Sequence, residues 1–374
     1  MIKRIIQDQI EEKFFKGKAI IILGPRQVGK TTLVKKICNE NSEIAQYLNA
    51  DESDIRDIFN NATSTRLKSV IGNKKLIVID EAQRIDNIGI AVKLIVDNFS
   101  DIQIIITGSS SFELKNKFNE PLTGRKYVFK LFPLSFSEMV NHTSIIEENR
   151  MIENRLIYGY YPEVLNKPNE QKEILNLLAE SYLFKDILST GLLKKTDVLE
   201  KLLQALGLQV GSEVKYNELA QLIGVDNQTI ERYIDILEKS FIVFRLQSFS
   251  RNLSNEIKKG KKIYFYDNGI LNSVIKNFNS VNLRNNIGGL WENFLVSERM
   301  KKNSYNNMYL NTYFWRTHTQ QEIDYIEEYD GKITGYEFKW NNTKKIKIPS
   351  IFINNYKNSE IIKINRENYS GFLL

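Results

Sequence analysis

The chain has 374 residues, which is too long for one ordinary hydrophobic core, so two to four domains are expected. It is 42% hydrophobic and 26% charged, and no apolar run approaches the roughly 20 residues of a membrane span, which argues against a membrane protein. One cysteine excludes an internal disulfide, and two histidines argue against a histidine-based zinc site. Residues 5–12 lack the uncharged core of a signal peptide, so we expect a cytoplasmic protein. The net charge of +7 permits contact with nucleic acid without requiring it.

The first motif follows an apolar run at residues 19–23, which predicts a buried strand. It reads G-x-x-x-x-G-K-T, the Walker A pattern, and a helical pattern follows it. Gly24 and Gly29 allow a tight turn that aims backbone N–H groups at phosphates, and the helix adds its positive end. Lys30 supplies charge for the β- and γ-phosphates, and the Thr31 hydroxyl can ligate Mg²⁺. We therefore predict ATP and Mg²⁺ as cofactors, with the ATP held by Gly24, Pro25, Arg26, Gln27, Val28, Gly29, Lys30, Thr31 and Thr32.

Further strands are expected at residues 44–51 and 75–80, and the second of these ends in Asp80 and Glu81. This is a Walker B pattern, in which Asp80 holds Mg²⁺ through water and Glu81 polarises the attacking water as a general base. Alone, Asp-Glu at a strand end is also a common helix cap. About 50 residues after a Walker A motif, it indicates an ATPase site.

Two more strands are predicted at residues 102–107 and 126–131. Strand–helix alternation over about 130 residues is typical of a parallel sheet with helices on both faces. We therefore predict an α/β fold, with a P-loop ATPase domain built on a parallel five-stranded sheet.

A series of short motifs resembles one ATPase family: residues 24–31 (Gly-Pro-Arg-Gln-Val-Gly-Lys-Thr), 79–83 (Ile-Asp-Glu-Ala-Gln), 107–111 (Thr-Gly-Ser-Ser-Ser), 122–125 (Leu-Thr-Gly-Arg) and 132–138 (Phe-Pro-Leu-Ser-Phe-Ser-Glu). The series looks like the AAA-type ATPases of archaea and bacteria whose C-terminal half is a domain of unknown function. Residues 159–163 and 185–187 fit the same family, so the resemblance spans nearly the whole chain. It implies ATP use but says little about the biological task.

Two further residues follow from positions used in AAA-type ATPases. Ser109, after the fourth strand, is a candidate sensor of the γ-phosphate, although residues 109–111 can equally cap the following helix. Arg125, before the fifth strand, is a candidate arginine finger that reaches a neighbour's nucleotide, or else a solvated surface residue. A finger acting on a neighbour implies a homo-oligomer.

The middle of the chain has helical spacing of apolar residues over 143–195, which predicts a lid or a connector. Residues 216–230 then suit a helix-turn-helix, with Ala220 where helices cross and Gly224 at the sharp turn. With apolar strands at 241–244 and 263–266, they predict a winged helix over 196–268.

Contact with DNA by this winged helix is one of two alternatives. The recognition helix carries Glu231, Asp235 and Glu238 against Arg232 and Lys239, which is a poor footprint for phosphate. The basic loop Lys258 to Lys262 can lie along a nucleic-acid backbone. The alternative for the whole module is packing between domains.

The last part, residues 269–374, carries an acidic pattern. Asp324 is followed, after twelve intervening residues, by Glu-x-Lys, which is the spacing of PD-(D/E)XK nucleases. Strand alternation puts Glu337 and Lys339 on one face. Asp324 and Glu337 can hold Mg²⁺, Glu292 on an upstream helix can complete its ligands, and Lys339 can act on the water. Such scaffolds can also keep these residues for ion binding or packing without cleavage.

The sequence thus predicts an ATPase domain at 1–142, a helical lid or connector at 143–195, a winged helix at 196–268 and an α/β nuclease-like domain at 269–374. We expect ATP binding and hydrolysis to be coupled to the two C-terminal domains, in DNA metabolism or defence. One rival is a nucleotide-gated switch whose inactive nuclease-like domain binds a protein partner. The other is an autonomous metal-dependent nuclease that ATP only gates.

Overall fold

The computed structural model describes residues 2–108, 121–180, 196–250, 260–317, 319–346 and 348–374. The chain forms two compact units, residues 1–133 with 239–241 and residues 134–238 with 242–374. No helix in these described ranges is long and apolar enough to cross a membrane.

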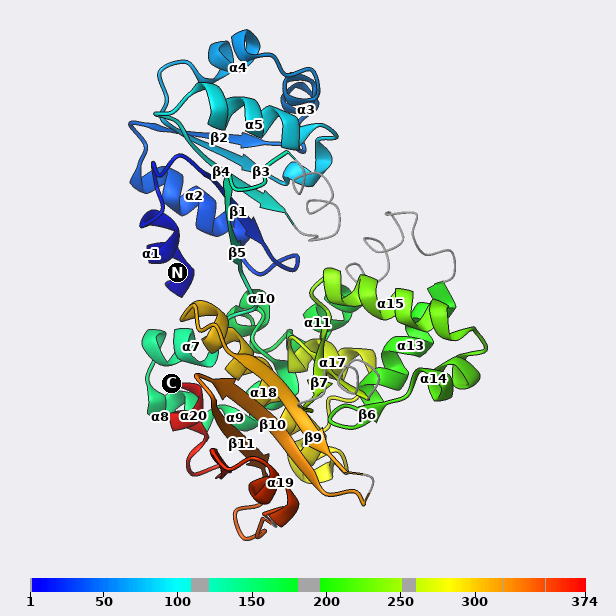
Figure 1. Cartoon of the computed structure of the whole chain (residues 1–374). Coiled ribbons are helices and arrows are strands. Elements are labelled where there is room, and N and C mark those ends of the chain that lie inside the picture. Colours follow the sequence, from blue (N-terminus) through cyan, green and yellow to red (C-terminus); the bar gives the residue numbers. More distant parts are fainter. Residues whose placement is uncertain (1, 109–120, 181–195, 251–259, 318, 347) are drawn as a thin grey trace. The chain divides into compact units, whose positions relative to one another are not determined.

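The first unit is built on a five-stranded parallel sheet with the strand order β2-β3-β4-β1-β5 (Figure 1). Its strands are β1 (Ala19–Leu23), β2 (Ala45–Asn49), β3 (Leu76–Asp80), β4 (Gln103–Gly108) and β5 (Lys126–Lys130). Every residue of β1, β3 and β4 is buried, as expected for inner strands that are covered on both faces. The parallel α/β sheet predicted from the apolar runs is confirmed.

Helices cover both faces of this sheet (Figure 1). The crossover from β1 to β2 runs along the sheet in the opposite direction to the crossovers from β2 to β3 and from β3 to β4. Right-handed connections therefore place α2 on one face and α3, α4 and α5 on the opposite face. The helices of this unit are α1 (Ile5–Glu11), α2 (Lys30–Glu40), α3 (Ser53–Asn60), α4 (Ser64–Ile71) and α5 (Ile88–Asn98), with a 3₁₀ turn η1 (Ala82–Arg84) after β3.

The second unit begins with the helices α7 (Phe136–His142), α8 (Ile145–Arg150), α9 (Ile152–Tyr158), α10 (Pro162–Asn166) and α11 (Gln171–Glu180). A capping box starts α7, because Ser135 and Glu138 each accept a hydrogen bond from the other's backbone N–H. The Tyr160 N–H donates to buried Asp267 at 2.7 Å, which ties these helices to the C-terminal part. Whether residues 143–195 act as a lid or as a connector stays open.

Residues 196–265 follow in the order α13 (Thr196–Leu208), β6 (Glu213–Val214), α14 (Tyr216–Ile223), α15 (Asn227–Lys239), β7 (Val243–Ser248) and β8 (Lys261–Phe265). Gly224 ends α14 with φ 80°, a left-handed conformation that favours glycine. β8 pairs antiparallel with both β6 and β7. This is the element order that a winged helix requires, and the assignment stays a prediction.

The C-terminal part contains α17 (Asn268–Val274), η3 (Val281–Leu283), α18 (Ile287–Tyr305), β9 (Asn311–Arg316), β10 (Glu322–Tyr329), β11 (Lys332–Phe338), α19 (Ser350–Asn355), β12 (Ser359–Ile364) and α20 (Tyr369–Leu373). Strands β9, β10 and β11 are antiparallel, and β12 runs parallel to β11. α18 contacts β11 and also β8.

One seven-stranded sheet, with the order β12-β11-β10-β9-β7-β8-β6, runs through both of these parts. Its joint is the parallel pairing of β7 with β9, in which Gln247 lies opposite Tyr313 and Ser248 opposite Phe314. The strands predicted for the winged helix and for the nuclease-like domain therefore continue one another. The predicted boundaries at residues 142, 195 and 268 stay predictions.

Candidate functional site

The P-loop leaves the sheet at the carboxyl end of β1 and ends where α2 begins. Gly29 has φ 95°, which only glycine adopts without strain. Gly24 is required for another reason, because a Cβ there would lie 2.0 Å from the carbonyl oxygen of Leu131. The predicted need for glycine at both positions therefore has two different causes, a turn at Gly29 and a close approach to the chain leaving β5 at Gly24.

Lys30 is the first residue of α2 and is 4% exposed. Its ammonium donates to the carbonyl oxygens of Gly24 at 2.9 Å and Pro25 at 2.7 Å, so its charge lies over the loop. The eleven-residue α2 begins at this loop, so its positive N-terminal end adjoins the Lys30 ammonium, and Thr31 follows directly. Of the remaining predicted residues, Arg26, Gln27 and Val28 lie in this turn, and Thr32 lies in the first turn of α2.

Asp80 ends β3 at the same edge of the sheet, because β1, β4 and β3 are neighbouring parallel strands. One of its carboxylate oxygens accepts from the Tyr47 hydroxyl at 2.7 Å, and the other accepts from the Thr107 hydroxyl. Burial and the bond to Asp80 raise the pKa of Tyr47 above its ordinary value, so this hydroxyl stays a donor. The two bonds fix the orientation of a carboxylate that is only 2% exposed.

Glu81 has φ 54°, a left-handed conformation that is strained for a residue with a side chain. Its N–H donates to the Thr107 hydroxyl at 3.1 Å, and its carboxylate accepts from the Gln83 amide. Thr107 thus contacts both Walker B residues. The sequence analysis did not identify Tyr47 and Thr107 as partners of the Walker B residues. The one feature that could have indicated them is that each is a polar residue near the end of a strand.

Arg4 is a further residue that the sequence did not reveal. It precedes α1, is 7% exposed, and donates to the carbonyl oxygens of Val28 at 2.6 Å and Phe132 at 2.7 Å. It therefore joins the P-loop to the chain that leaves β5. Guanidinium donors to buried carbonyls are charge-assisted bonds, stronger than neutral ones.

Arg125 lies at the amino-terminal ends of the strands, whereas the P-loop lies at their carboxyl ends. Its carbonyl oxygen accepts from the N–H of Ala19 at 2.9 Å, at the start of β1, whereas the P-loop follows the end of that strand. Its guanidinium contacts Asp97 at 2.6 Å. The chain's own P-loop thus lies at the other end of β1, and the arginine finger stays a prediction. The predicted sensor Ser109 lies outside the described residues.

The residues around the P-loop fit the phosphates of ATP and a Mg²⁺ ion. The donor set consists of a lysine, the N-terminal N–H groups of a helix and the Thr31 hydroxyl, which suit phosphate and a hard cation. Asp80 adds an oriented carboxylate at the same edge of the sheet. When bound, Mg²⁺ would neutralise charge on the β- and γ-phosphates.

In the second unit, the predicted C-terminal residues gather in one group of acids and lysines, called here the acidic cluster: Glu292, Asp324, Glu337 and Lys339, together with Glu322 and Lys262. Lys339 Nζ lies 2.8 Å from Glu337 and 3.6 Å from Asp324. Lys262 Nζ lies 2.8 Å from Glu292 and 2.5 Å from Glu322. The sequence predicted four of these six residues. It did not predict Glu322 or Lys262, which comes from the distant strand β8.

Burial dominates the electrostatics of the acidic cluster. It raises the pKa of Glu292 to about 7 against the opposing effect of Lys262. Burial, with repulsion from Asp324, also raises the pKa of Glu337 to about 7. Burial alone would lower the pKa of Lys262, but Glu292, Asp324 and Glu322 raise it above its ordinary value, so Lys262 is charged.

The acidic cluster does not fit a metal centre. Over the described ranges, no three acidic, histidine or cysteine side chains are grouped so that they could hold a metal ion. The predicted ligands Glu292, Asp324 and Glu337 instead face the ammonium groups of Lys262 and Lys339.

The predicted DNA-contacting residues are placed as follows. Asp235 and Glu238 of α15 pair with Arg245 of β7. In the basic loop, Lys258 and Lys259 lie outside the described residues. The prediction is wrong for Lys262, which is 0% exposed because its ammonium serves the buried acids. Lys261 lies 5.1 Å above the ring of Tyr216.

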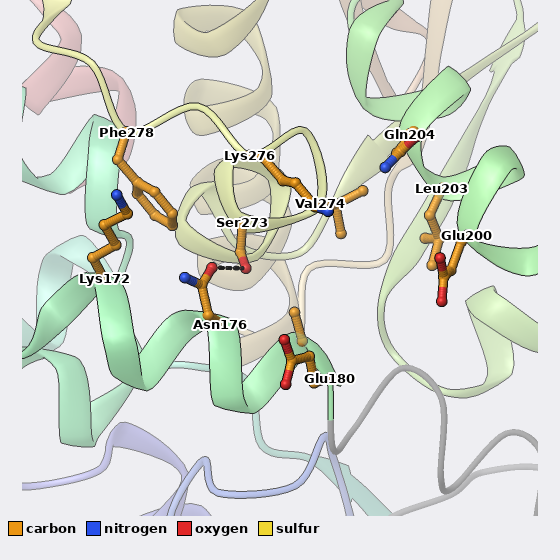
Figure 2. Close-up of a pocket in the computed structure, with 11 residues that line it drawn as sticks. Lys172, Asn176, Glu180, Glu200, Leu203, Gln204, Ser273, Val274, Lys276 and Phe278 are labelled. Carbon is orange, nitrogen blue, oxygen red and sulfur yellow. Dashed lines mark hydrogen bonds between the residues drawn. The ribbon is translucent and has the colours of Figure 1, made fainter.

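A cavity of about 400 Å³ lies among α11, α13 and α17 (Figure 2). Figure 2 shows the Ser273 hydroxyl and Asn176 directed toward one another, and the hydroxyl donates to the amide oxygen at 3.0 Å. The Lys172 ammonium lies 5.9 Å from the Phe278 ring centroid. The cavity is lined by two lysines and two glutamates, Lys172, Lys276, Glu180 and Glu200. Because these charges are equal in number, the lining indicates neither an anionic nor a cationic ligand.

Comparison with protein families divides the chain in three. Residues 16–140 match a family described as AAA domain, and residues 149–281 and 287–370 match two families described as domains of unknown function, DUF8612 and DUF4143. The first part of the chain is therefore an AAA domain, as its motifs indicated.

Relatives occur in bacteria and archaea. An uncharacterized protein of Mycobacterium tuberculosis is 25% identical over 346 residues, which cover 90% of this chain and 74% of that protein. An uncharacterized protein of Methanocaldococcus jannaschii is 25% identical over 344 residues, covering 86% and 75%. Among solved structures, Drosophila ORC bound to AT-rich DNA and Cdc6 covers 72% of this chain and 90% of the matched chain, at 8% identity and a TM-score of 0.27. The Pif1 helicase of Candida albicans covers 48% of each chain, at 14% identity and a TM-score of 0.25; no conclusion follows from scores this low.

Proposed function

We propose that this AAA-domain protein hydrolyses ATP and couples its nucleotide state to the C-terminal unit. The observation that carries the first part is the arrangement at one edge of the sheet. Lys30 and Thr31 begin α2 there, Asp80 and Glu81 end β3, and the Thr107 hydroxyl links the two Walker B residues.

In this proposal each residue has one task. The loop N–H groups and the Lys30 ammonium bind the β- and γ-phosphates, which requires Lys30 to exchange its bonds to Gly24 and Pro25 for phosphate oxygens. Thr31 and Asp80 would hold Mg²⁺. Glu81 takes the proton of the attacking water.

Arg125 is proposed to act on the nucleotide of a neighbouring subunit in a homo-oligomer, because its own P-loop lies at the far edge of the sheet. Its pair with Asp97 has an exposed arginine side chain, so little free energy would be lost in releasing it. Ser109 remains the proposed γ-phosphate sensor.

For the C-terminal unit we propose a winged helix joined to a nuclease-like fold that acts as the responding part. Of the roles that the sequence left open, partner binding without cleavage is better supported than cleavage, because lysines occupy the acids that a metal would need. A role in DNA metabolism or defence stays part of the proposal. Its DNA contacts would have to come from residues other than Lys262.

The experiment is ATP turnover by the full chain with Mg²⁺, in the presence and absence of DNA. Lys30→Ala should lose ATP binding, because the ammonium is the loop's mobile charge. Glu81→Gln should bind ATP but barely hydrolyse it, because the amide cannot accept a proton. Lys68→Ala, at an exposed residue of α4, is the control and should match the wild type. Equal turnover by Glu81→Gln and the wild type would refute the proposed base, and DNA-stimulated turnover would favour the DNA role over the protein-partner switch.

A further inference from the structure

Lys262 is a buried cation that the proposed ATPase does not use. It lies on β8, is 0% exposed, and places its ammonium 5.5 Å from the Phe314 ring centroid. Its acidic partners come from elsewhere in the chain, Glu292 from α18 at 2.8 Å and Glu322 from the start of β10 at 2.5 Å. A buried ammonium is tolerated only with such partners, because dehydration is costly for an unpaired charge.

Glu292 is enclosed by the same part of the chain that supplies Lys262. The Tyr264 hydroxyl, also on β8, donates to the carboxylate oxygen that Lys262 contacts, at 2.6 Å. A Cβ on Gly211 would lie 3.0 Å from the other oxygen, so the turn before β6 lies directly against the carboxylate. The turn at Gly211 and strand β8 thus cover the acid that was predicted to complete a metal site.

The acids around Lys262 have cationic side chains of the chain itself as neighbours. Asp324 interacts electrostatically with both Lys262 and Glu292, and Asp324 Oδ2 accepts from the backbone N–H of Phe338 at 2.8 Å. Lys339 supplies a second ammonium to Asp324 and Glu337. Arg316 of β9 lies 3.8 Å from Glu322, so this acid has two cationic neighbours.

We propose that Lys262 is the resident cation of the acidic cluster and stands where a nuclease of this fold would hold a divalent metal ion. It fastens the wing strand β8 to α18 and β10, in addition to the pairing of β7 with β9. The ion pairs therefore join the two matched domains, residues 149–281 and 287–370. The cluster stabilises this joint and does not cleave phosphodiester bonds. This inference is independent of ATP hydrolysis.

The first test is Mn²⁺ binding to the full wild-type chain without nucleotide, measured by melting temperature in EDTA and in millimolar Mn²⁺. Asp324→Asn is run beside it, so that any Mn²⁺ effect from the ATPase domain appears in both proteins and is subtracted. The expected result is no difference between the two Mn²⁺ shifts. A shift in the wild type that disappears in Asp324→Asn would establish a metal centre and overturn the proposal.

The second test removes the cation. Lys262→Met should lower the melting temperature by at least about 6 °C, because it leaves buried carboxylates without their partner. Lys332→Met is the matched control, since Lys332 of β11 pairs with Glu360 in an exposed pair at 2.7 Å, and its loss should shift melting by less than about 4 °C. Unchanged melting of Lys262→Met would overturn the proposal.

The third test offers a metal to the vacated place. Lys262→Ala leaves room beside Glu292, Glu322 and Asp324, so Mn²⁺ should restore part of its lost melting temperature, and Lys262→Ala/Glu292→Gln should show less recovery. Equal recovery in both variants would count against the proposal. If the Lys262 variants do not fold, Glu322→Gln, which keeps the pair of Lys262 with Glu292, should still melt below the wild type and show the same Mn²⁺ shift as the wild type.

Discussion

The clearest stability and binding effect is expected at Arg4, which sequence motifs did not single out. Arg4→Met keeps an apolar stem of similar reach but removes the donors to Val28 at 2.6 Å and Phe132 at 2.7 Å. A hydrogen bond to a charged group contributes about 1.5–3 kcal/mol, so losing both would cost roughly 3–6 kcal/mol of folded-state free energy. Only the bond to Val28 holds the P-loop itself. If the free energy of this one bond is lost from the ATP-binding conformation of the loop, ATP affinity should fall at least tenfold, which corresponds to about 1.4 kcal/mol.

The assay is ATP binding by titration calorimetry, together with melting of the free protein. Lys3→Met is the matched control, because Lys3 is the preceding residue, is exposed, and pairs with Asp8 at 2.8 Å. Arg4→Lys should recover part of the affinity, since one ammonium can reach one of the two carbonyls. A folded Arg4→Met protein that binds ATP within about twofold of the wild type would refute the reasoning, because the bond to Val28 would then contribute nothing to the loop.

The other predictions concern the Walker B edge, the finger and the acidic cluster. Thr107→Val should lower kcat about tenfold in a steady-state assay, because Asp80 loses a fixed hydrogen bond; an unchanged kcat would contradict this. Arg125→Ala should bind ATP yet hydrolyse it poorly, and mixing it with Lys30→Ala should recover activity if subunits exchange and the finger acts in trans; no recovery would leave Arg125 a surface residue. The raised pKa of Glu337, about 7 against an ordinary 4.5, gives stability that is present below about pH 4.5 and lost as the pH rises through about 7. Wild-type melting should therefore fall from about pH 5 to about pH 8 more steeply than that of Glu337→Gln, and equal slopes would argue against the shift.

The sequence predicted those features that depend on neighbouring residues. The strands β1, β3 and β4 followed from uninterrupted apolar runs, because inner strands of a parallel sheet are buried on both faces. The Walker residues Lys30 and Asp80 followed from short motifs at strand ends. Their meeting at one edge of the sheet is a consequence of parallel strands, so the candidate ATP site could be derived before any coordinates.

The features that were missed depend on contacts between distant residues. The reason for Gly24 lies in Leu131, more than a hundred residues away, and Arg4 acts through Val28 and Phe132. Lys262 was interpreted as part of an exposed basic loop because its neighbours in sequence are lysines. Nothing local indicates that its side chain reaches Glu292 in the protein interior. A run of lysines in the sequence does not show which of its side chains is buried, because burial depends on contacts with distant residues.

In the proposed coupling, the nucleotide held by the P-loop changes the state of the C-terminal unit. Hydrogen–deuterium exchange of the Glu81→Gln protein, with and without Mg²⁺-ATP, tests it most directly, because this variant should hold ATP without turnover. Lys30→Ala in the same buffers is the control for effects that do not need bound nucleotide. We predict that ATP changes exchange in peptides from residues 134–374 of Glu81→Gln and not of Lys30→Ala. Changes confined to residues 2–133 would contradict the account.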